Sequence, residues 1–360
     1  MTLSRTEGSA ADFVRAALGV DHVEANLGLV NYTALPLLEA ALDRLGDEDS
    51  VARARVLGRL GRALSHQGDH QRATAILAEA IALARRCGDS GALSDALDAQ
   101  QVTLSGWPCP GAQFAERRQA LDEMLAAAEE IGDVSAVVEA EMWRVSGFLE
   151  LCDRVSFETS LKRFGDFSER YQLSNFGWGL GCAGALRAIL CGQFAEAERL
   201  ADRAFEIGRE VHGELAIGVY GVQMFTIRRE QGRLAEVAPL FRRFLDENPG
   251  DTVWRPGLAV IASDLGFDEA ARKALADMAS MGLPADARRS LTLSYLAEVC
   301  ARLGDAARAE WLYHELLPYR DNMILAPVAT VCCGAAARYL GMLAGTMENW
   351  TASEEHSRPQ

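Results

Sequence analysis

The sequence predicts an all-α fold, in which about eight helical hairpins form one continuous array without a sheet. Alanine, leucine, arginine and glutamate dominate the 360 residues and only 10 are proline, so long helices are permitted almost throughout. Glycines recur where helices would turn back, and alanines follow one face of the helices between them. The alternation of β-branched residues that is typical of strands is hard to find.

The clearest hairpin runs from Leu60 to Asp89. Its turn is predicted at Gly68-Asp69, and its second helix is striped by Ala73, Leu77 and Ala80 at spacings of four and three. This is the tetratricopeptide arrangement, in which small residues let antiparallel helices approach and a glycine breaks the chain between them. One hairpin cannot bury its own apolar face, so we expect stacked copies in a right-handed tetratricopeptide-like superhelix, an α-solenoid.

Residues 1–50 are the least regular part and are expected to form an N-terminal helical cap. Short helices are predicted over Ala10–Gly19 and Leu35–Leu45, the second ending at Gly46. The acidic run 47–50 then precedes the array, and carboxylates are favourable at helix N-termini. We interpret this run as a helix cap rather than a cation site, because a metal loop needs more oxygen ligands at fixed offsets.

The array itself is predicted from 51 to 350, followed by a polar tail at 351–360. Its first helices are expected at 51–67, 70–87, 91–104, 113–131, 134–151 and 155–171. Later turns are predicted at Gly192, Gly232, Gly266 and Gly304, and Cys152 stands where a turn glycine is usual. The hairpin that turns at Gly232 carries Val237, Phe241 and Phe244 and stops at Pro249.

Two uncharged segments are interpreted as largely buried helices, Tyr171–Leu186 and Asn322–Ala337. The first contains four glycines between 173 and 184, each of which costs a helix about 0.5–1 kcal/mol relative to alanine. We therefore expect close helix packing to offset that loss.

The net charge of −15 argues against a nucleic-acid-binding face, which needs clustered basic residues. Lys162 and Lys273 are the only lysines, and neither follows a glycine-rich loop, so no P-loop or Schiff-base lysine is predicted. No uncharged run is long enough for a bilayer span, and residues 1–20 do not resemble a signal peptide. We expect a soluble protein with no membrane partner.

The eight cysteines form no C-x-x-C pair and no small-domain disulfide framework. Free thiols on apolar helix faces behave as small hydrophobes, and a reducing cytoplasm fits them best. Cys332 and Cys333 are adjacent, which raises redox sensing as an alternative to two buried small residues on a helix.

Three phrases carry a resemblance to a known group: QFAEAERL at 193–200, IRREQGRL at 227–234 and RYLGMLA at 338–344. With several helices ending in Gly-Asp, they resemble the C-terminal tetratricopeptide-like region of large bacterial ATP-dependent regulators. These are the LuxR-type activators and the class III adenylate cyclases that carry an ATPase module. The resemblance covers Leu27 to Trp350.

In that family the region is a sensor and interaction arm, and in maltotriose-responsive activators it binds a small inducer inside the superhelix. This chain has no Walker G-x-x-x-x-G-K-[ST] motif, and no basic helix-turn-helix follows Trp350. The resemblance therefore implies either a free-standing sensor arm or a truncated relative of a larger regulator.

Other motifs favour ordinary structural roles. The run Gly177–Gly181 has no preceding strand, so a dinucleotide loop is not predicted. His66 and His70 fall on either side of a turn and lack further ligands for zinc. No G-x-S-x-G motif or arrangement of serine, histidine and acid stands out. No enzyme, cofactor or metal site is predicted.

The inner wall of the superhelix remains, lined by the first helix of each hairpin. A mixture of arginine, carboxylate and aromatic side chains suits a peptide or a small polar ligand, although an ordinary solvated face is the simpler interpretation. The candidate groove residues are Arg55, Arg62, His66, Glu139, Trp143, Arg229, Glu298 and Arg302, with Ser146, Leu186 and Leu190 on the same wall.

We therefore expect a non-catalytic sensor or scaffold module that binds a protein, peptide or small ligand in bacterial signalling or transcriptional regulation. The alternatives are an enzyme with its active site in the superhelix bore and a degenerate fragment with no binding role. At the C-terminal end, few apolar residues follow Trp350 to cover the last hairpin. That face is expected to self-associate or to dock another chain, with Met342, Leu343 and Trp350 at the contact.

Overall fold

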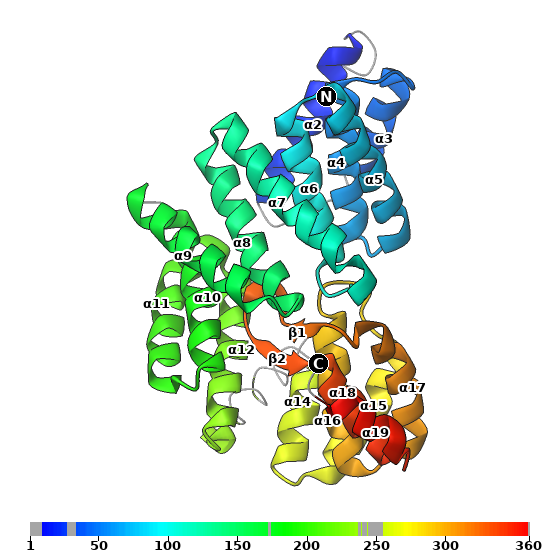
Figure 1. The fold of residues 1–360 in the computed structure, drawn as a ribbon, viewed down its shortest axis with the longest axis vertical. Coiled ribbons are helices and arrows are strands. Elements are labelled where there is room, and N and C mark those ends of the chain that lie inside the picture. Colours follow the sequence, from blue (N-terminus) through cyan, green and yellow to red (C-terminus); the bar gives the residue numbers. More distant parts are fainter. Residues whose placement is uncertain are drawn as a thin grey trace. The chain divides into compact units, whose positions relative to one another are not determined.

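The structure is a computed structural model that describes residues 9–26, 34–171, 174–236, 239, 243 and 255–358. Over these residues it contains 17 α-helices, and consecutive helices joined by short turns pack against each other (Figure 1). The all-α helical-hairpin class predicted from the sequence is confirmed. The hairpin ending at Pro249, with Val237, Phe241 and Phe244, lies outside the described residues.

The chain divides into two compact units. Unit 1 comprises Met1–Ser105, Glu116–Trp143 and Ala285–Ala287, and unit 2 comprises Gly106–Ala115, Arg144–Pro284 and Arg288–Gln360. This division does not test the predicted boundaries at 50 and 350, which stay a prediction.

Unit 1 is built on the hairpin that the sequence shows most clearly. Its helices are α2 (Ala10–Asn26), α3 (Ala34–Leu45), α4 (Val51–His66), α5 (His70–Cys87), α6 (Ser90–Leu104), most of α7 (Phe114–Ile131) and the first part of α8 (Val134–Glu150). Helix α4 packs against both α5 and α6. The core of its N-terminal half holds Phe13, Leu38, Leu60 and Leu64, which are almost completely buried.

The Gly-Asp pairs have a physical explanation in the turns. Gly88 ends α5 with a left-handed φ of 63°, and the carboxylate of Asp89 then accepts a hydrogen bond from the backbone N–H of Ala92 at 2.7 Å. Glycine therefore supplies the left-handed residue and aspartate caps the next helix. Cys152 has a positive φ of 59° at the predicted glycine place, so this turn is also confirmed.

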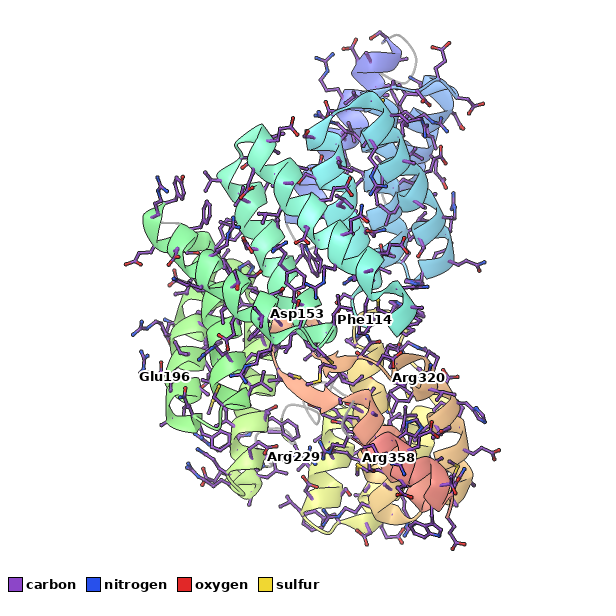
Figure 2. All side chains as sticks on the ribbon, in the orientation of Figure 1. Phe114, Asp153, Glu196, Arg229, Arg320 and Arg358 are labelled. Atoms are coloured by element: carbon purple, nitrogen blue, oxygen red, sulfur yellow. The ribbon has the colours of Figure 1, made fainter. Side chains whose placement is uncertain are left out.

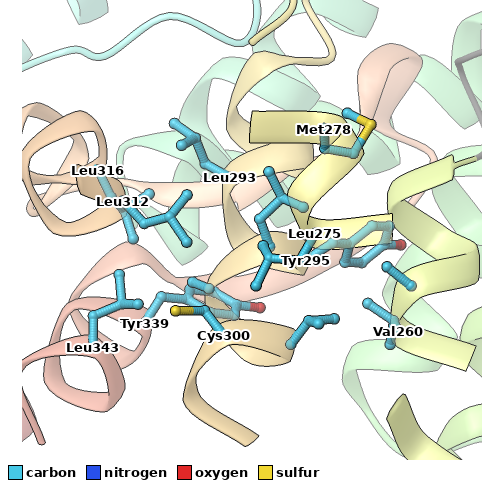
Figure 3. Close-up of a cluster of buried hydrophobic side chains, with 14 of the residues drawn as sticks. Val260, Leu275, Met278, Leu293, Tyr295, Cys300, Leu312, Leu316, Tyr339 and Leu343 are labelled. Atoms are coloured by element: carbon cyan, nitrogen blue, oxygen red, sulfur yellow. The ribbon is translucent and has the colours of Figure 1, made fainter. Parts of the chain in front are cut away.

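Unit 2 holds the remaining helices and the strands. They are η1 (Gly111–Gln113), α9 (Arg154–Arg170), α10 (Ser174–Leu190), α11 (Phe194–His212), α12 (Glu214–Glu230), η2 (Leu234–Glu236), α14 (Arg255–Asp264), α15 (Asp268–Met281), α16 (Arg289–Leu303), α17 (Ala306–Leu316), η3 (Leu317–Tyr319), β1 (Met323–Leu325), η4 (Pro327–Ala329), β2 (Cys332–Ala335), α18 (Ala336–Thr346) and α19 (Trp350–Ser357). Its largest core cluster gathers side chains of α14 to α18, including Tyr295, Leu312 and Tyr339 (Figure 3).

The glycine-rich segment lies inside α10 and is not a phosphate-binding loop. A Cβ built on Gly181 would stand 2.8 Å from the Cβ of Ala204 on α11, so only glycine lets the two helices come this close. The expected close packing is confirmed. It extends to α11 itself, where Gly208 faces the ring of Trp178.

The Gly208→Ala variant is expected to lose about 1–3 kcal/mol of unfolding free energy, the usual cost of overpacking a core. Its Cβ would stand 2.3 Å from Trp178 Cδ1, and that buried ring makes a tilted contact with His212 at a centroid distance of 4.3 Å. Urea denaturation measures the change. Gly184→Ala is the matched control, because its Cβ would meet Leu200 at an ordinary 3.5 Å. Equal stability of the two variants would contradict the packing argument.

Two predictions for the C-terminal part are wrong: the helix over residues 322–337 and the absence of a sheet. Residues 322–337 do not form a helix: β1 and β2 pair antiparallel with Met323 opposite Ala335, so a two-stranded sheet is present. Pro327 interrupts any helix here, and the β-branched Thr330 and Val331 favour an extended chain. Within the predicted polar tail, α19 forms a helix that packs along α18.

Helix α19 closes the last hairpin mainly with small polar side chains. The Ser353 hydroxyl donates to the backbone carbonyl of Gly341 at 2.9 Å, and a Cβ on Gly341 would stand 3.1 Å from the Ser357 hydroxyl. The glycine on α18 and the serines on α19 thus let the two helices approach closely. Leu340 and Leu343 beneath them are fully buried.

Candidate functional site

A cleft of about 640 Å³ opens in unit 2 between the last two helices and the start of the sheet. Its lining comes from the turn before α9, the segment before β1, the end of β2, and α18 and α19. The residues that line it are Cys152, Arg320, Asp321, Asn322, Ala335, Ala337, Arg338, Gly341, Met342, Ser353, His356, Ser357 and Arg358. The volume suits a small organic ligand.

One wall of the cleft is held by a docked loop. The side chain of Asn322 accepts from the Cys109 N–H at 3.0 Å and donates to the Cys109 carbonyl at 2.9 Å. Beside it, Asp321 accepts from the Gly111 N–H at 3.0 Å. These bonds hold the proline-containing loop 105–111 against the segment before β1, so this wall of the cleft is held in place by specific hydrogen bonds.

Three arginines belong to the lining of the cleft. Two of them, Arg320 and Arg358, are labelled in Figure 2. The side chains of Arg320, Arg338 and Arg358 are 62%, 57% and 72% exposed. Each contacts a carboxylate through one nitrogen: Arg320 reaches Asp321 at 3.7 Å, Arg338 reaches Glu298 at 3.1 Å and Arg358 reaches Glu354 at 3.2 Å. Glu298 and Glu354 are not part of the lining. The guanidinium groups therefore retain donors for a further acceptor.

The remaining polar groups of the cleft are poorly suited to nucleophilic chemistry. Burial and the neighbouring Asp321 raise the pKa of the Cys152 thiol, against a backbone hydrogen bond. His356 shares a hydrogen bond of 2.8 Å between its Nε2 and the Tyr313 hydroxyl. Burial lowers its pKa, so it is neutral at neutral pH. The hydroxyls of Ser353 and Ser357 donate to backbone carbonyls.

An ion cluster lies behind Arg338 and contains three of the predicted groove residues. Arg229 donates from Nε to Asp264 at 2.7 Å and from Nη2 to Glu298 at 2.6 Å. Arg302 contacts the other oxygen of Asp264 at 3.2 Å. Burial opposes the charge on Arg229, but the two carboxylates outweigh it and its pKa is raised. The sequence predicts Arg229, Glu298 and Arg302 as separate groove residues and does not predict Asp264 or Arg338.

Two further groove residues meet in unit 1 through a residue that was not predicted. The carboxylate of Asp98, only 8% exposed on α6, pairs with Arg62 of α4. It also accepts from the indole Nε1 of Trp143 on α8 at 2.6 Å. Asp98 on α6 thereby links α4 and α8. Arg62 and Trp143 therefore hold these helices of unit 1 together.

The other predicted groove residues are more dispersed. Arg55 pairs with Asp89 at 3.4 Å at the solvent edge of unit 1. Glu139 is exposed, yet desolvation by the surrounding protein raises its pKa, with Arg62 opposing this. Leu186 is fully buried and cannot line a groove, whereas Leu190 is 44% exposed.

His66 is expected to make unit 1 less stable as the pH falls below 6.5, the ordinary pKa of a histidine side chain. Burial and then Arg62 lower the pKa of His66 in the folded state, so the unfolded chain binds the proton more tightly. Stability is thus lost as the pH falls from 6.5 through the folded-state pKa. Solvent reaches this imidazole, so the effect is small. Urea denaturation at about pH 7.5 and pH 5.5 measures the effect as the difference between the two midpoints. This difference should be smaller for His66→Gln than for the wild type, and an equal difference would contradict the role of His66.

The predicted C-terminal contact is only partly accessible. Trp350 is 69% exposed and Met342 is half-buried. Leu343 is fully buried in the core cluster and cannot contribute to a contact, which corrects that part of the prediction (Figure 3). Self-association stays a prediction, and light scattering of the wild type and Trp350→Ser at high concentration tests it.

The vicinal cysteines lie on β2 and not on a helix, which corrects their predicted placement. Burial raises the pKa of Cys332 to about 11 and that of Cys333 to about 12. Protonated thiols are poor nucleophiles and oxidise slowly. None of the eight cysteines forms a disulfide.

Neither a metal-binding cluster nor a membrane span is found among the described residues. No group of three or more His, Cys, Asp and Glu side chains there is placed to hold a metal ion. None of the described helices combines the length and apolar character needed to cross a bilayer. No known protein family matches the sequence, and no curated protein matches it significantly. The resemblance to regulator arms therefore stays a prediction.

Proposed function

We propose that this chain is a non-catalytic sensor or scaffold module whose ligand occupies the cleft of unit 2. The observation that carries the proposal is the cleft itself, a hollow of about 640 Å³ with charged side chains on its rim. Arg338 belongs to both the cleft and the ion cluster, donating to Glu298 beside Arg229. A ligand that engages Arg338 competes with Glu298, which gives binding a route to the packing of α12, α14 and α16.

The resemblance to regulator arms supports a role in bacterial signalling or transcriptional regulation, and the tetratricopeptide-like pattern of the hairpins supports the same assignment. The absence of a disulfide among the eight cysteines supports a reducing, cytoplasmic setting. An enzyme in the bore has less support. His356 Nε2 is already hydrogen-bonded to Tyr313, burial raises the pKa of the Cys152 thiol, and the hydroxyls of Ser353 and Ser357 donate to backbone carbonyls.

A thermal-shift screen with neutral, cationic and anionic small molecules tests the proposal. A ligand that binds only the folded state at a concentration of about 100 times its Kd adds about 2.7 kcal/mol of stability. We expect at least one class to raise Tm with no turnover of the ligand. Failure of all classes to raise Tm, or turnover of a ligand that is lost on substitution in the cleft, contradicts the proposal.

A further inference from the structure

We infer that the cleft of unit 2 selects a small organic anion, with its acidic group held by arginines and its carbon skeleton lying on an apolar floor. This rests on the proposed function and adds the chemical class of the ligand. The lining contains three arginines and a single carboxylate, Asp321, in a chain whose net charge is −15. The lining therefore carries more positive than negative side chains, whereas the chain as a whole is negatively charged.

The lone carboxylate of the lining does not cancel this charge. Asp321 is engaged by the Gly111 N–H at 3.0 Å, and its contact with Arg320 is long, at 3.7 Å. The carboxylate partners of Arg338 and Arg358 lie outside the lining. An anion in the cleft therefore meets guanidinium donors first. Arginine binds carboxylate, sulfonate and phosphate groups through paired N–H donors, which gives such sites both strength and geometry.

The floor of the cleft indicates the rest of the ligand. Ala335, Ala337, Gly341 and Met342 line it without a charged group, and Met342 adapts its shape to an apolar body. A bare inorganic ion would leave this surface and most of the volume unfilled. An anion with an aromatic or aliphatic skeleton buries it. The combination of an apolar floor and a basic rim thus favours an amphiphilic organic anion.

The probe for the test is 8-anilinonaphthalene-1-sulfonate, whose sulfonate and aromatic rings match the two parts of the cleft. Its fluorescence is titrated on the full chain, and citrate is the competitor. We expect saturable binding of one dye per chain that citrate displaces. The Arg320→Ala/Arg358→Ala double variant should bind the dye about tenfold more weakly or worse, because it loses charge-assisted hydrogen bonds.

The matched control is Arg199→Ala/Arg209→Ala, which removes the same charge from α11. These arginines also belong to unit 2 and are about half exposed, and each pairs with one carboxylate, as Arg320 and Arg358 do. Wild-type affinity in the control and weak binding in the cleft variant supports the inference. Thermal unfolding of each variant verifies its folded state.

Equal dye affinity in the cleft variant and the wild type, or no saturable binding to the wild type, overturns the inference. The proposed function fails separately, when no class of small molecule raises Tm. If a neutral or cationic ligand raises Tm while the dye and citrate do not, the proposed binding function is supported and the inference of an anionic ligand is overturned.

Discussion

Glu298→Ala is expected to lower the free energy of unfolding by about 3 kcal/mol, the largest effect of any single substitution proposed for unit 2. Glu298 is 8% exposed and holds Arg229 at 2.6 Å and Arg338 at 3.1 Å. Removing the carboxylate leaves the guanidinium of Arg229, whose side chain is 25% exposed, with Asp264 as its remaining carboxylate. Asp264 then compensates this mostly buried guanidinium only in part, and breaking a buried pair is costly because of the charge that is left behind.

Two companion variants separate charge from packing in this cluster. Glu298→Gln keeps an acceptor of nearly the same shape and should lose less stability than Glu298→Ala. Arg302→Ala removes an arginine whose side chain is 50% exposed, and exposed pairs contribute at most about 1 kcal/mol. Chemical denaturation of the three variants gives the order of their losses in unfolding free energy. A loss in Glu298→Ala no greater than that in Arg302→Ala would show that the cluster does not stabilise unit 2.

Asp98→Ala is expected to lower the free energy of unfolding by about 2–3 kcal/mol, the corresponding effect in unit 1. Asp98 pairs with Arg62 and accepts from Trp143 Nε1 at 2.6 Å, so one substitution removes the shared partner of α4 and α8. Loss of a charge-assisted hydrogen bond and of the indole acceptor accounts for this size. Urea denaturation followed by tryptophan fluorescence reports both the midpoint and the environment of the indoles.

The control for Asp98 is the removal of an exposed carboxylate in the same unit. Glu39 pairs with Arg72 at 2.6 Å, and both side chains are more than a third exposed. Glu39→Ala should therefore change stability little. If Asp98→Ala matches Glu39→Ala, Asp98 does not tie the helices of unit 1 together.

Helices and turns could be predicted from the sequence because their determinants are local. A glycine at a left-handed position followed by a capping aspartate marks a helix boundary whatever the helices pack against, as at Gly88-Asp89 and Gly304-Asp305. The β-hairpin at 323–335 was missed because its uncharged residues have no strong periodicity. Its docking partners, the backbone groups of Cys109 and Gly111, lie more than two hundred residues earlier in the chain.

The candidate sites were predictable only as faces of helices. Counting back from the turns selected Arg229 and Glu298, which form an ion pair, and Arg302, which shares Asp264 with Arg229. The same counting did not find Arg338, because it lies at the start of α18, after the misassigned segment. The cleft was missed for a related reason. Its wall depends on α19, which packs through serine against Gly341 and carries no apolar stripe in its sequence.

Hydrogen–deuterium exchange of the full chain, with and without saturating 8-anilinonaphthalene-1-sulfonate, tests the central claim most directly. If the cleft of unit 2 is the binding site, backbone amides of α18, α19 and residues 320–322 exchange more slowly with the dye, because binding stabilises the folded form of these segments. The Arg320→Ala/Arg358→Ala variant should show no such slowing. Protection confined to unit 1, or equal protection in the variant and the wild type, would contradict the assignment of the cleft as the ligand site.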